Sequence, residues 1–169
     1  MSEYQEIRNQ LKSGDIIAFT DAGIFGGWLI RTFTKGPYAH VGVVWKIGDR
    51  IFILEDRLRS GVSIRSLSRV GNFDWIPANI EWTRKIERHA ISKLQLPYSI
   101  LNAIALGLKL KPLKGNYVCS LFVADILSIP RDFATPTFVV NWLVERGSKI
   151  TSVTNNWKRR INTDKSVKE

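Results

Sequence analysis

The stretch YAHVGVVWKIGDRIFILED, residues 38–56, decides how this chain folds. Its β-branched and aromatic residues on either side of Gly48-Asp49 predict two antiparallel strands joined by a tight turn. His40 opens the first strand and Glu55 closes the second. The hairpin therefore places a carboxylate on the strand next to the imidazole, where it can fix the orientation of the ring.

Two neighbouring carboxyl groups end this stretch, and strand alternation separates them. Successive side chains of a strand point to opposite faces of the sheet. Glu55 thus shares a face with Ile53, and Asp56 shares the opposite face with Leu54. Only one of the two carboxylates can face His40.

A second stretch, YVCSLFVADIL at residues 117–127, supplies a nucleophile. Cys119 is the one cysteine of the chain and lies where an apolar helix is predicted to begin. A thiol at a helix N-terminus feels the positive end of the helix dipole, which favours the thiolate. A nearby imidazole adds to this effect and can protonate a leaving group. Cys119 and His40 are therefore candidate catalytic residues.

The order His40, Glu55, Cys119 resembles that of the permuted NlpC-like cysteine hydrolases. These form the YaeF/YiiX-type branch of the papain-like superfamily and are related to lecithin:retinol acyltransferase-like enzymes. The similarity extends over roughly residues 13–143. It includes the segments Gly14-Asp15-Ile16-Ile17, Trp28-Leu29-Ile30-Arg31, Gly61-Val62-Ser63-Ile64, Leu96-Pro97-Tyr98 and Cys119-Ser120.

The resemblance implies hydrolysis or transfer at an amide, ester or thioester carbonyl through an acyl-cysteine. Cys119 would attack the carbonyl, His40 would act as base and then as acid, and Glu55, favoured over Asp56 by its position, would orient His40. Many members carry an acidic residue two positions after the cysteine, where this chain has Leu121. Any part that this acid plays in substrate choice is not carried over.

Three further residues are candidates for substrate binding. Tyr38 precedes the histidine strand and Tyr98 begins the helix before the cysteine, so both could line a cleft or pack at the sheet edge. Asp15, at the start of the first strand, could bind substrate or satisfy loop amides. The backbone N–H of Cys119 is a candidate oxyanion donor. One cysteine and two distant histidines do not make a metal site, and we expect no metal and no cofactor.

Composition predicts a single α+β domain over residues 1–153 and a polar, basic tail at 154–169. The resemblance implies a circularly permuted papain-like, NlpC-type fold, with a small antiparallel barrel-like sheet and packed helices. Helices are predicted at residues 3–11, 25–33, 83–93, 98–108, 118–127 and 137–145. Strands are predicted at residues 15–19, 39–46, 50–55, 61–65, 72–76 and 149–153.

The chain shows no signal-peptide pattern and no segment long enough to span a membrane. The N-terminal residues are acidic and polar, and the most apolar stretch, residues 100–110, is short. We therefore expect a cytoplasmic protein or one that is peripheral to a membrane.

A formal net charge of +10 concerns partners and not the fold. The basic residues are dispersed, so anionic membranes, acidic cell-wall polymers and nucleic acid are all compatible with it. No nucleic-acid-binding motif is present, and we do not expect nucleic acid to be the main partner. The first hypothesis is an amidase or peptidase acting on peptide or cell-wall amides. The alternatives are a lipid acyl hydrolase or acyltransferase at a membrane surface, suggested by the apolar helix ending in lysines by Lys114, and a non-catalytic basic binding module.

Overall fold

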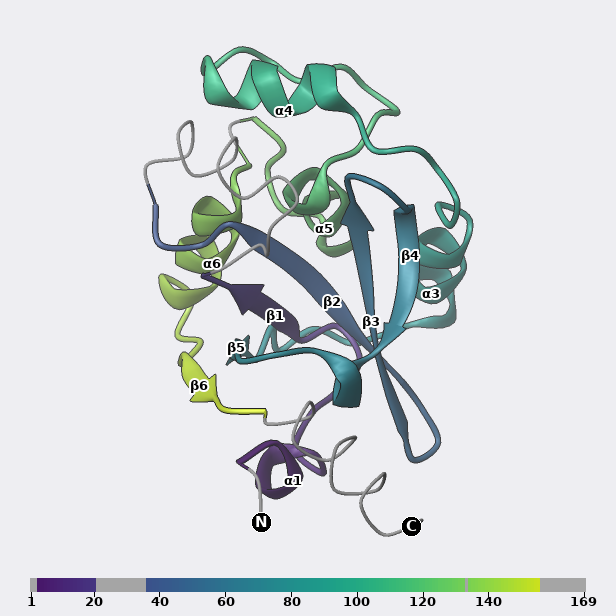
Figure 1. Ribbon diagram of the computed structural model, residues 1–169, viewed down its shortest axis with the longest axis vertical. Coiled ribbons are helices and arrows are strands. Elements are labelled where there is room, and N and C mark those ends of the chain that lie inside the picture. Colours follow the sequence, from purple (N-terminus) through teal and green to yellow (C-terminus); the bar gives the residue numbers. More distant parts are fainter. Residues whose placement is uncertain (1–2, 21–35, 133, 156–169) are drawn as a thin grey trace, which may run out of the picture.

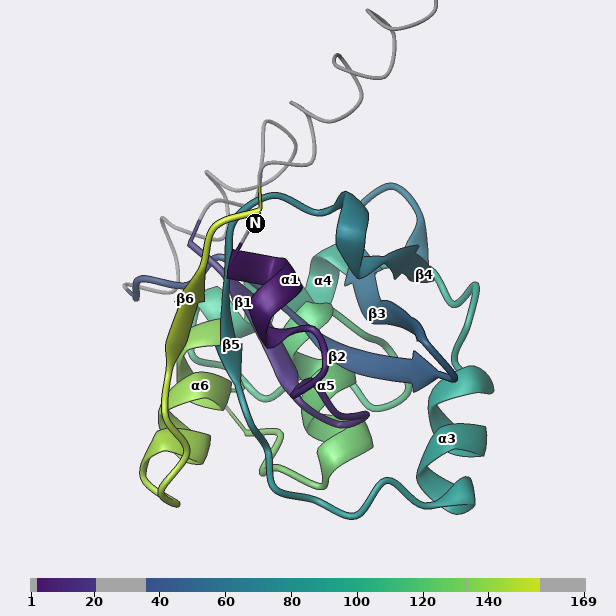
Figure 2. The same cartoon turned by 90° about the horizontal axis from the view of Figure 1, so that it is seen from below.

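The computed structural model describes residues 3–20, 36–132 and 134–155. Its strands form one antiparallel sheet in the order β4-β3-β2-β1-β5-β6 (Figure 1). The strands are β1 (Ile16–Phe19), β2 (His40–Ile47), β3 (Arg50–Arg57), β4 (Gly61–Ser66), β5 (Phe73–Ile76) and β6 (Thr151–Val153). Figure 2 shows the strands running from β6 at one side of the molecule to β3 and β4 at the other. All six strands lie where the sequence predicts them, with ends that differ by one or two residues.

The described α-helices also follow the predicted order. The helices are α1 (Glu3–Ile7), the short 3-10 helix η1 (Leu67–Arg69), α3 (Arg84–Ile91), α4 (Ile100–Gly107), α5 (Cys119–Leu127) and α6 (Pro136–Val144). Helix α1 ends at Ile7 instead of Leu11, and the short helix η1 was not predicted. Thr83, Ser99 and Thr135 cap α3, α4 and α6 by accepting a hydrogen bond from a first-turn N–H group. The predicted helix 25–33 lies outside the described residues.

The turn at Gly48-Asp49 sets the register of the central hairpin, as predicted. Ile47 pairs with Arg50, which leaves the two turn residues between them, and Gly48 has a φ of +54°. The same register pairs Val43 with Leu54. Glu55 and Asp56 consequently end up on opposite faces near the end of β3.

Hydrophobic residues pack on both faces of the sheet. On one face, Val43 and Leu54 belong to the same buried cluster as Phe122 of α5 and Val140 of α6. Helix α5 is almost wholly buried, and Asp125 is its one residue outside the buried set. On the other face, Ile53 packs in a second cluster that includes Tyr4 of α1. The sheet is thus sandwiched, and α5 reaches its interior with Cys119 as its first residue.

The predicted barrel-like closure is not found among the described strands, because the outer edge of β4 is already occupied. Val62 donates its N–H to the Leu96 carbonyl at 2.9 Å, and Gln95 donates to the Val62 carbonyl at 2.8 Å. Residues 95–96 reach β4 this closely because Gly61 has no side chain: a Cβ at Gly61 would lie 2.1 Å from the Leu96 oxygen. The sheet therefore stays open, with β4 and β6 at its edges.

Candidate active site

His40, Glu55 and Cys119 meet at one end of the sheet. His40 is the first residue of β2, Cys119 is the first residue of α5, and Glu55 lies near the end of β3. The Nε2 atom of His40 lies 2.7 Å from Oε2 of Glu55. Cys119 also interacts with the imidazole and raises its pKa. Because Glu55 occupies Nε2, the other ring nitrogen, Nδ1, is the one left for the thiol.

Glu55 is fully buried and its two oxygens accept three hydrogen bonds. Besides His40, the donors are Nε and Nη2 of Arg65, at 2.7 Å and 3.1 Å. Burial alone would raise the pKa of Glu55, but the hydrogen bonds and positive charges of His40 and Arg65 outweigh it and hold the pKa below its usual value. Glu55 is therefore an ionised anchor for the imidazole.

The environment of His40 favours the imidazolium. Burial of the ring lowers its pKa, but the neighbouring Cys119 and the Glu55 carboxylate outweigh this and raise the pKa to about 10. The ring of Phe19 lies against the imidazole, with the ring centres 5.6 Å apart. At neutral pH His40 thus carries a second proton, which it can give to a leaving group.

Cys119 is buried, with 2% of its surface exposed, at the start of α5. The N-cap residue, Val118, supplies no side-chain hydrogen bond to the first turn. The hydroxyl of Ser120 is likewise buried and has no partner. The first turn of α5 is therefore left without a side-chain cap, and the positive end of the helix dipole lies at the Cys119 end of the helix.

Asp56 is a second buried carboxyl beside this group. It is 1% exposed, and neither of its oxygens has a hydrogen-bond partner. Burial raises its pKa to about 7, an effect that the charge of His40 partly offsets. Asp56 lies on the sheet face that α5 covers, whereas Glu55 lies on the opposite face, as the alternation of β3 predicts.

Tyr98 lies close enough to Cys119 and Asp56 for their charges to act on its hydroxyl. Burial raises the pKa of its hydroxyl, and the negative charges of Cys119 and Asp56 raise it further. A neutral phenol is consequently kept next to the sulfur. Of the three predicted substrate-binding residues, Tyr98 is the one that the structure brings to the site.

Tyr38 is held elsewhere. Its hydroxyl donates to Asp74 Oδ2 at 2.7 Å, and its backbone N–H donates to Thr137 Oγ1 at 3.3 Å. Burial, together with Asp74, raises the pKa of the Tyr38 hydroxyl well above its usual value. The alternative reading, a tyrosine packed at the sheet edge with a satisfied hydroxyl, fits this geometry.

Asp15 lies near the opposite end of β1 from Phe19, the residue that pairs with His40. Its carboxylate accepts hydrogen bonds from the backbone N–H of Lys12 at 2.9 Å and Ala78 at 3.3 Å, and from Trp75 Nε1 at 2.9 Å. These donors use both oxygens of a buried side chain. Asp15 therefore satisfies loop amides and does not join the site.

Arg65 and Phe19 are site residues that the sequence reasoning did not single out. Arg65 pairs with Ile53 and so shares the face of Glu55, two residues along β4 from Ser63, the direct partner of Glu55. This position could have been predicted from the sequence by counting the β3–β4 register from the pair Arg57 and Gly61 at the hairpin turn. Phe19 reaches His40 through the β1–β2 pairing, whose register the local sequence does not specify.

Comparison with solved structures finds a similar fold in the crystal structure of the metalloprotein yiiX from Escherichia coli O157:H7 (DUF1105). The similarity has a TM-score of 0.54 at 17% sequence identity and covers 69% of this chain and 64% of the other. No family model and no curated protein sequence matches the chain. The fold is thus a mixed α+β fold of the YiiX kind. Within residues 3–20, 36–132 and 134–155, no group of three or more His, Cys, Asp or Glu side chains could hold a metal ion.

Proposed function

We propose that this protein is a thiol hydrolase of the permuted papain-like type, which acts through an acyl-cysteine on Cys119. The observation that carries the proposal is the double engagement of His40: one ring nitrogen is bonded to the buried Glu55 and the ring also interacts with Cys119 at an uncapped helix start. The YiiX-like fold and the order of the three residues support it.

The chemistry follows from these positions. The proton of the thiol lies on Nδ1 of His40, and the sulfur of Cys119 attacks the carbonyl carbon. The first N–H groups of α5 stabilise the oxyanion, while Glu55 keeps Nε2–H of His40 in place. The imidazolium then protonates the leaving amine or alcohol as its bond to carbon breaks. A water molecule, deprotonated by His40, then attacks the acyl-cysteine. The bond between carbon and sulfur breaks, the carboxylic acid product leaves, and His40 returns the proton to the sulfur.

The substrate class that we propose first is an amide, in a peptide or a cell-wall fragment. A second candidate, a lipid acyl substrate, is favoured by one observation: the segment between Tyr98 and Tyr117, next to Cys119, exposes many leucine and isoleucine side chains. The same acyl-cysteine serves both, because amide, ester and thioester carbonyls differ in the leaving group that His40 protonates.

Profiling of Cys119 with electrophilic probes tests the proposal. Iodoacetamide should alkylate the wild-type protein at mildly acidic pH, and a panel of peptide amides, nitrophenyl esters and acyl thioesters should identify the class that turns over. His40→Ala should slow both reactions, and Cys119→Ser should abolish them. His89→Ala is the matched control, because His89 pairs with Asp125 at 3.0 Å on a more exposed surface and should leave both unchanged.

Equal alkylation of the wild-type and His40→Ala proteins, with no turnover of any panel member, would refute the hydrolase. The protein would then be better described as a binding module that retains the fold.

A further inference from the structure

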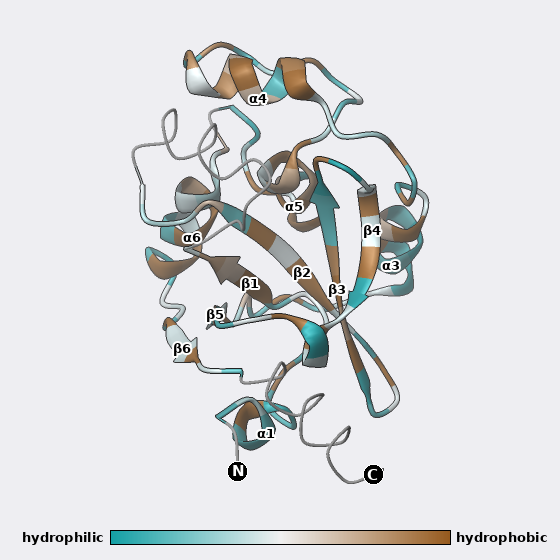
Figure 3. Ribbon diagram, in the orientation of Figure 1, coloured by the Kyte–Doolittle hydropathy of each residue, from teal (hydrophilic) through white to brown (hydrophobic). Residues whose placement is uncertain are grey.

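The segment between Tyr98 and Tyr117 presents an unusual apolar surface, which we call the α4 arm (residues 99–116). Figure 1 shows α4 standing apart from the sheet, beyond the start of α5, and Figure 3 shows that it is largely hydrophobic. Leu106 is buried, but six large apolar side chains of the arm are between 39% and 68% exposed: Ile100, Leu101, Ile104, Leu108, Leu110 and Leu113. These are six of the twelve large hydrophobic residues exposed in the described part of the chain. Such a concentration marks an interaction surface.

Internal hydrogen bonds hold the arm in this shape. The fully buried Asn102 donates from Nδ2 to the carbonyls of Leu113 at 3.0 Å and Asn116 at 2.9 Å, and it accepts the N–H of Leu113 at 2.8 Å. At the end of α4, Leu110 donates to the Ala105 carbonyl at 2.8 Å, and Lys109 adopts a left-handed φ of +57°. This is a Schellman termination. The buried amide of Asn102 therefore satisfies backbone groups inside the arm, while most of the leucines stay exposed.

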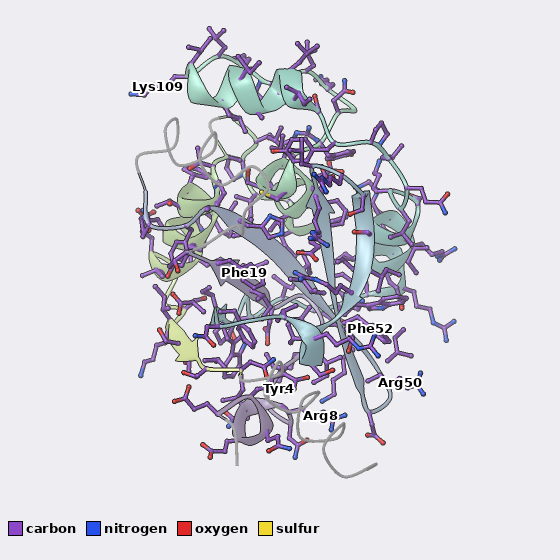
Figure 4. The ribbon with its side chains drawn as sticks, in the orientation of Figure 1. Tyr4, Arg8, Phe19, Arg50, Phe52 and Lys109 are labelled. Atoms are coloured by element: carbon purple, nitrogen blue, oxygen red, sulfur yellow. The ribbon has the colours of Figure 1, made fainter. Side chains whose placement is uncertain are left out.

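The charge of the arm selects its partner. Lys109, Lys111 and Lys114 are exposed, and no Asp or Glu occurs anywhere in residues 88–124. Figure 4 shows Lys109 at the end of α4, pointing away from the domain. Lys111 lies 3.8 Å from Asp132, but both side chains are exposed, so the pair is weak. Leucines bordered by lysines fit an anionic lipid surface, which accepts both.

A second copy of this chain fits less well. A symmetric dimer through the arm would bring the lysines of both copies together at one interface, where like charges repel. The arm would not cross a bilayer either, because no described helix is long and apolar enough to span one. The arm would lie in the plane of the membrane interface.

Both ends of the arm are attached beside the candidate active site. Tyr98 and Tyr117 form a parallel bridge, and Ser99 donates its N–H to the Tyr117 carbonyl at 2.7 Å. Tyr98 lies next to Cys119, which follows Tyr117 by two residues. A surface that holds the arm therefore also holds Cys119 close beneath it.

We infer that the α4 arm docks the protein on anionic lipid membranes. The inference of docking depends on the α4 arm alone. The further step, in which docking presents a membrane-borne acyl substrate to Cys119, rests on the proposed function.

Co-sedimentation of the full chain with lipid vesicles tests the docking. Vesicles of phosphatidylcholine with phosphatidylserine should bind the wild-type protein, less so at high salt, and phosphatidylcholine alone should bind it weakly. The double variant Leu101→Gln/Leu108→Gln should weaken binding by about tenfold or more, because both side chains leave water on docking. Changing Lys109, Lys111 and Lys114 to Gln should weaken it by about 100-fold, since each lysine near such a surface contributes about 1 kcal/mol.

Two controls separate this inference from its alternatives. Leu58→Gln changes an exposed leucine outside the arm and should bind vesicles as the wild type does. Cys119→Ser should also bind normally, so a failure of the proposed chemistry would leave docking intact. The inference is overturned if anionic vesicles do not bind the wild type, if both arm variants bind equally well, or if sedimentation velocity shows a dimer that Leu101→Gln/Leu108→Gln dissolves.

Discussion

Glu55→Gln removes the charge of the buried carboxylate while keeping its size. Three donor groups point at Glu55: Nε2 of His40, and Nε and Nη2 of Arg65. Glutamine offers one acceptor oxygen and one NH₂ group, so it cannot accept all three. Because Arg65 is always charged, we expect the amide oxygen to turn to Arg65 and the NH₂ group to face His40.

This arrangement would force His40 into the wrong tautomer. Nε2 would have to accept a hydrogen bond, which leaves the proton on Nδ1, the nitrogen that should take the thiol proton. A hydrogen bond to a charged group contributes about 1.5–3 kcal/mol, and about 1.4 kcal/mol corresponds to a tenfold change in rate. Turnover should therefore fall about 10- to 100-fold. Stability should fall by only about 2 kcal/mol, because Arg65 is 32% exposed and can be rehydrated.

The assay compares initial rates on the best substrate of the panel with urea unfolding followed by tryptophan fluorescence. Asp56→Asn is the matched control, an isosteric loss of charge at the next residue on the other face of β3, and should leave turnover nearly intact. A Glu55→Gln protein that turns over within about threefold of wild type, or an Asp56→Asn protein that loses more, would show that Glu55 does not orient His40.

The remaining predictions concern stability. The folded-state pKa of Asp56 is raised from 3.8 to about 7. The stability that its protonated carboxyl contributes is therefore fully present below pH 3.8 and is lost as pH rises through 7. The stability of Asp56→Asn relative to the wild type should therefore rise between pH 3.8 and about 7, by at most about 4 kcal/mol at 1.36 kcal/mol per pKa unit. A stability difference in urea unfolding that does not change with pH would contradict the raised pKa of Asp56. Asp15→Ala should lose about 2–4 kcal/mol of unfolding free energy by the same assay, while the alkylation rate of Cys119 in the folded protein stays at the wild-type value. A slower alkylation rate would show that Asp15 takes part in the active site. Gly61→Ala should lose at least about 2 kcal/mol, because its Cβ would meet the Leu96 oxygen; Gly71→Ala, with open space around it, is the control, and equal melting temperatures would refute the account.

Much of the site could be predicted because its parts are local. The turn at Gly48-Asp49 fixes the register of its own hairpin, and alternation then puts Glu55 and Asp56 on opposite faces. The roles of Asp15 and Tyr38 could not be predicted in the same way. Each side chain has a hydrogen-bond partner on β5, Trp75 for Asp15 and Asp74 for Tyr38, more than thirty residues away in sequence.

The sequence by itself determined the order of the elements, the hairpin, and a cysteine at the start of an apolar helix, since these depend on periodicity, turn residues and helix-start chemistry within short windows. Only the tertiary structure decided that Arg65 shares the Glu55 carboxylate, that Asp56 is buried without a partner, that residues 95–96 close the edge of β4, and that the α4 arm exposes most of its leucines. The physical reason is that burial and hydrogen-bond satisfaction are properties of packed neighbours, and these neighbours come from distant parts of the chain.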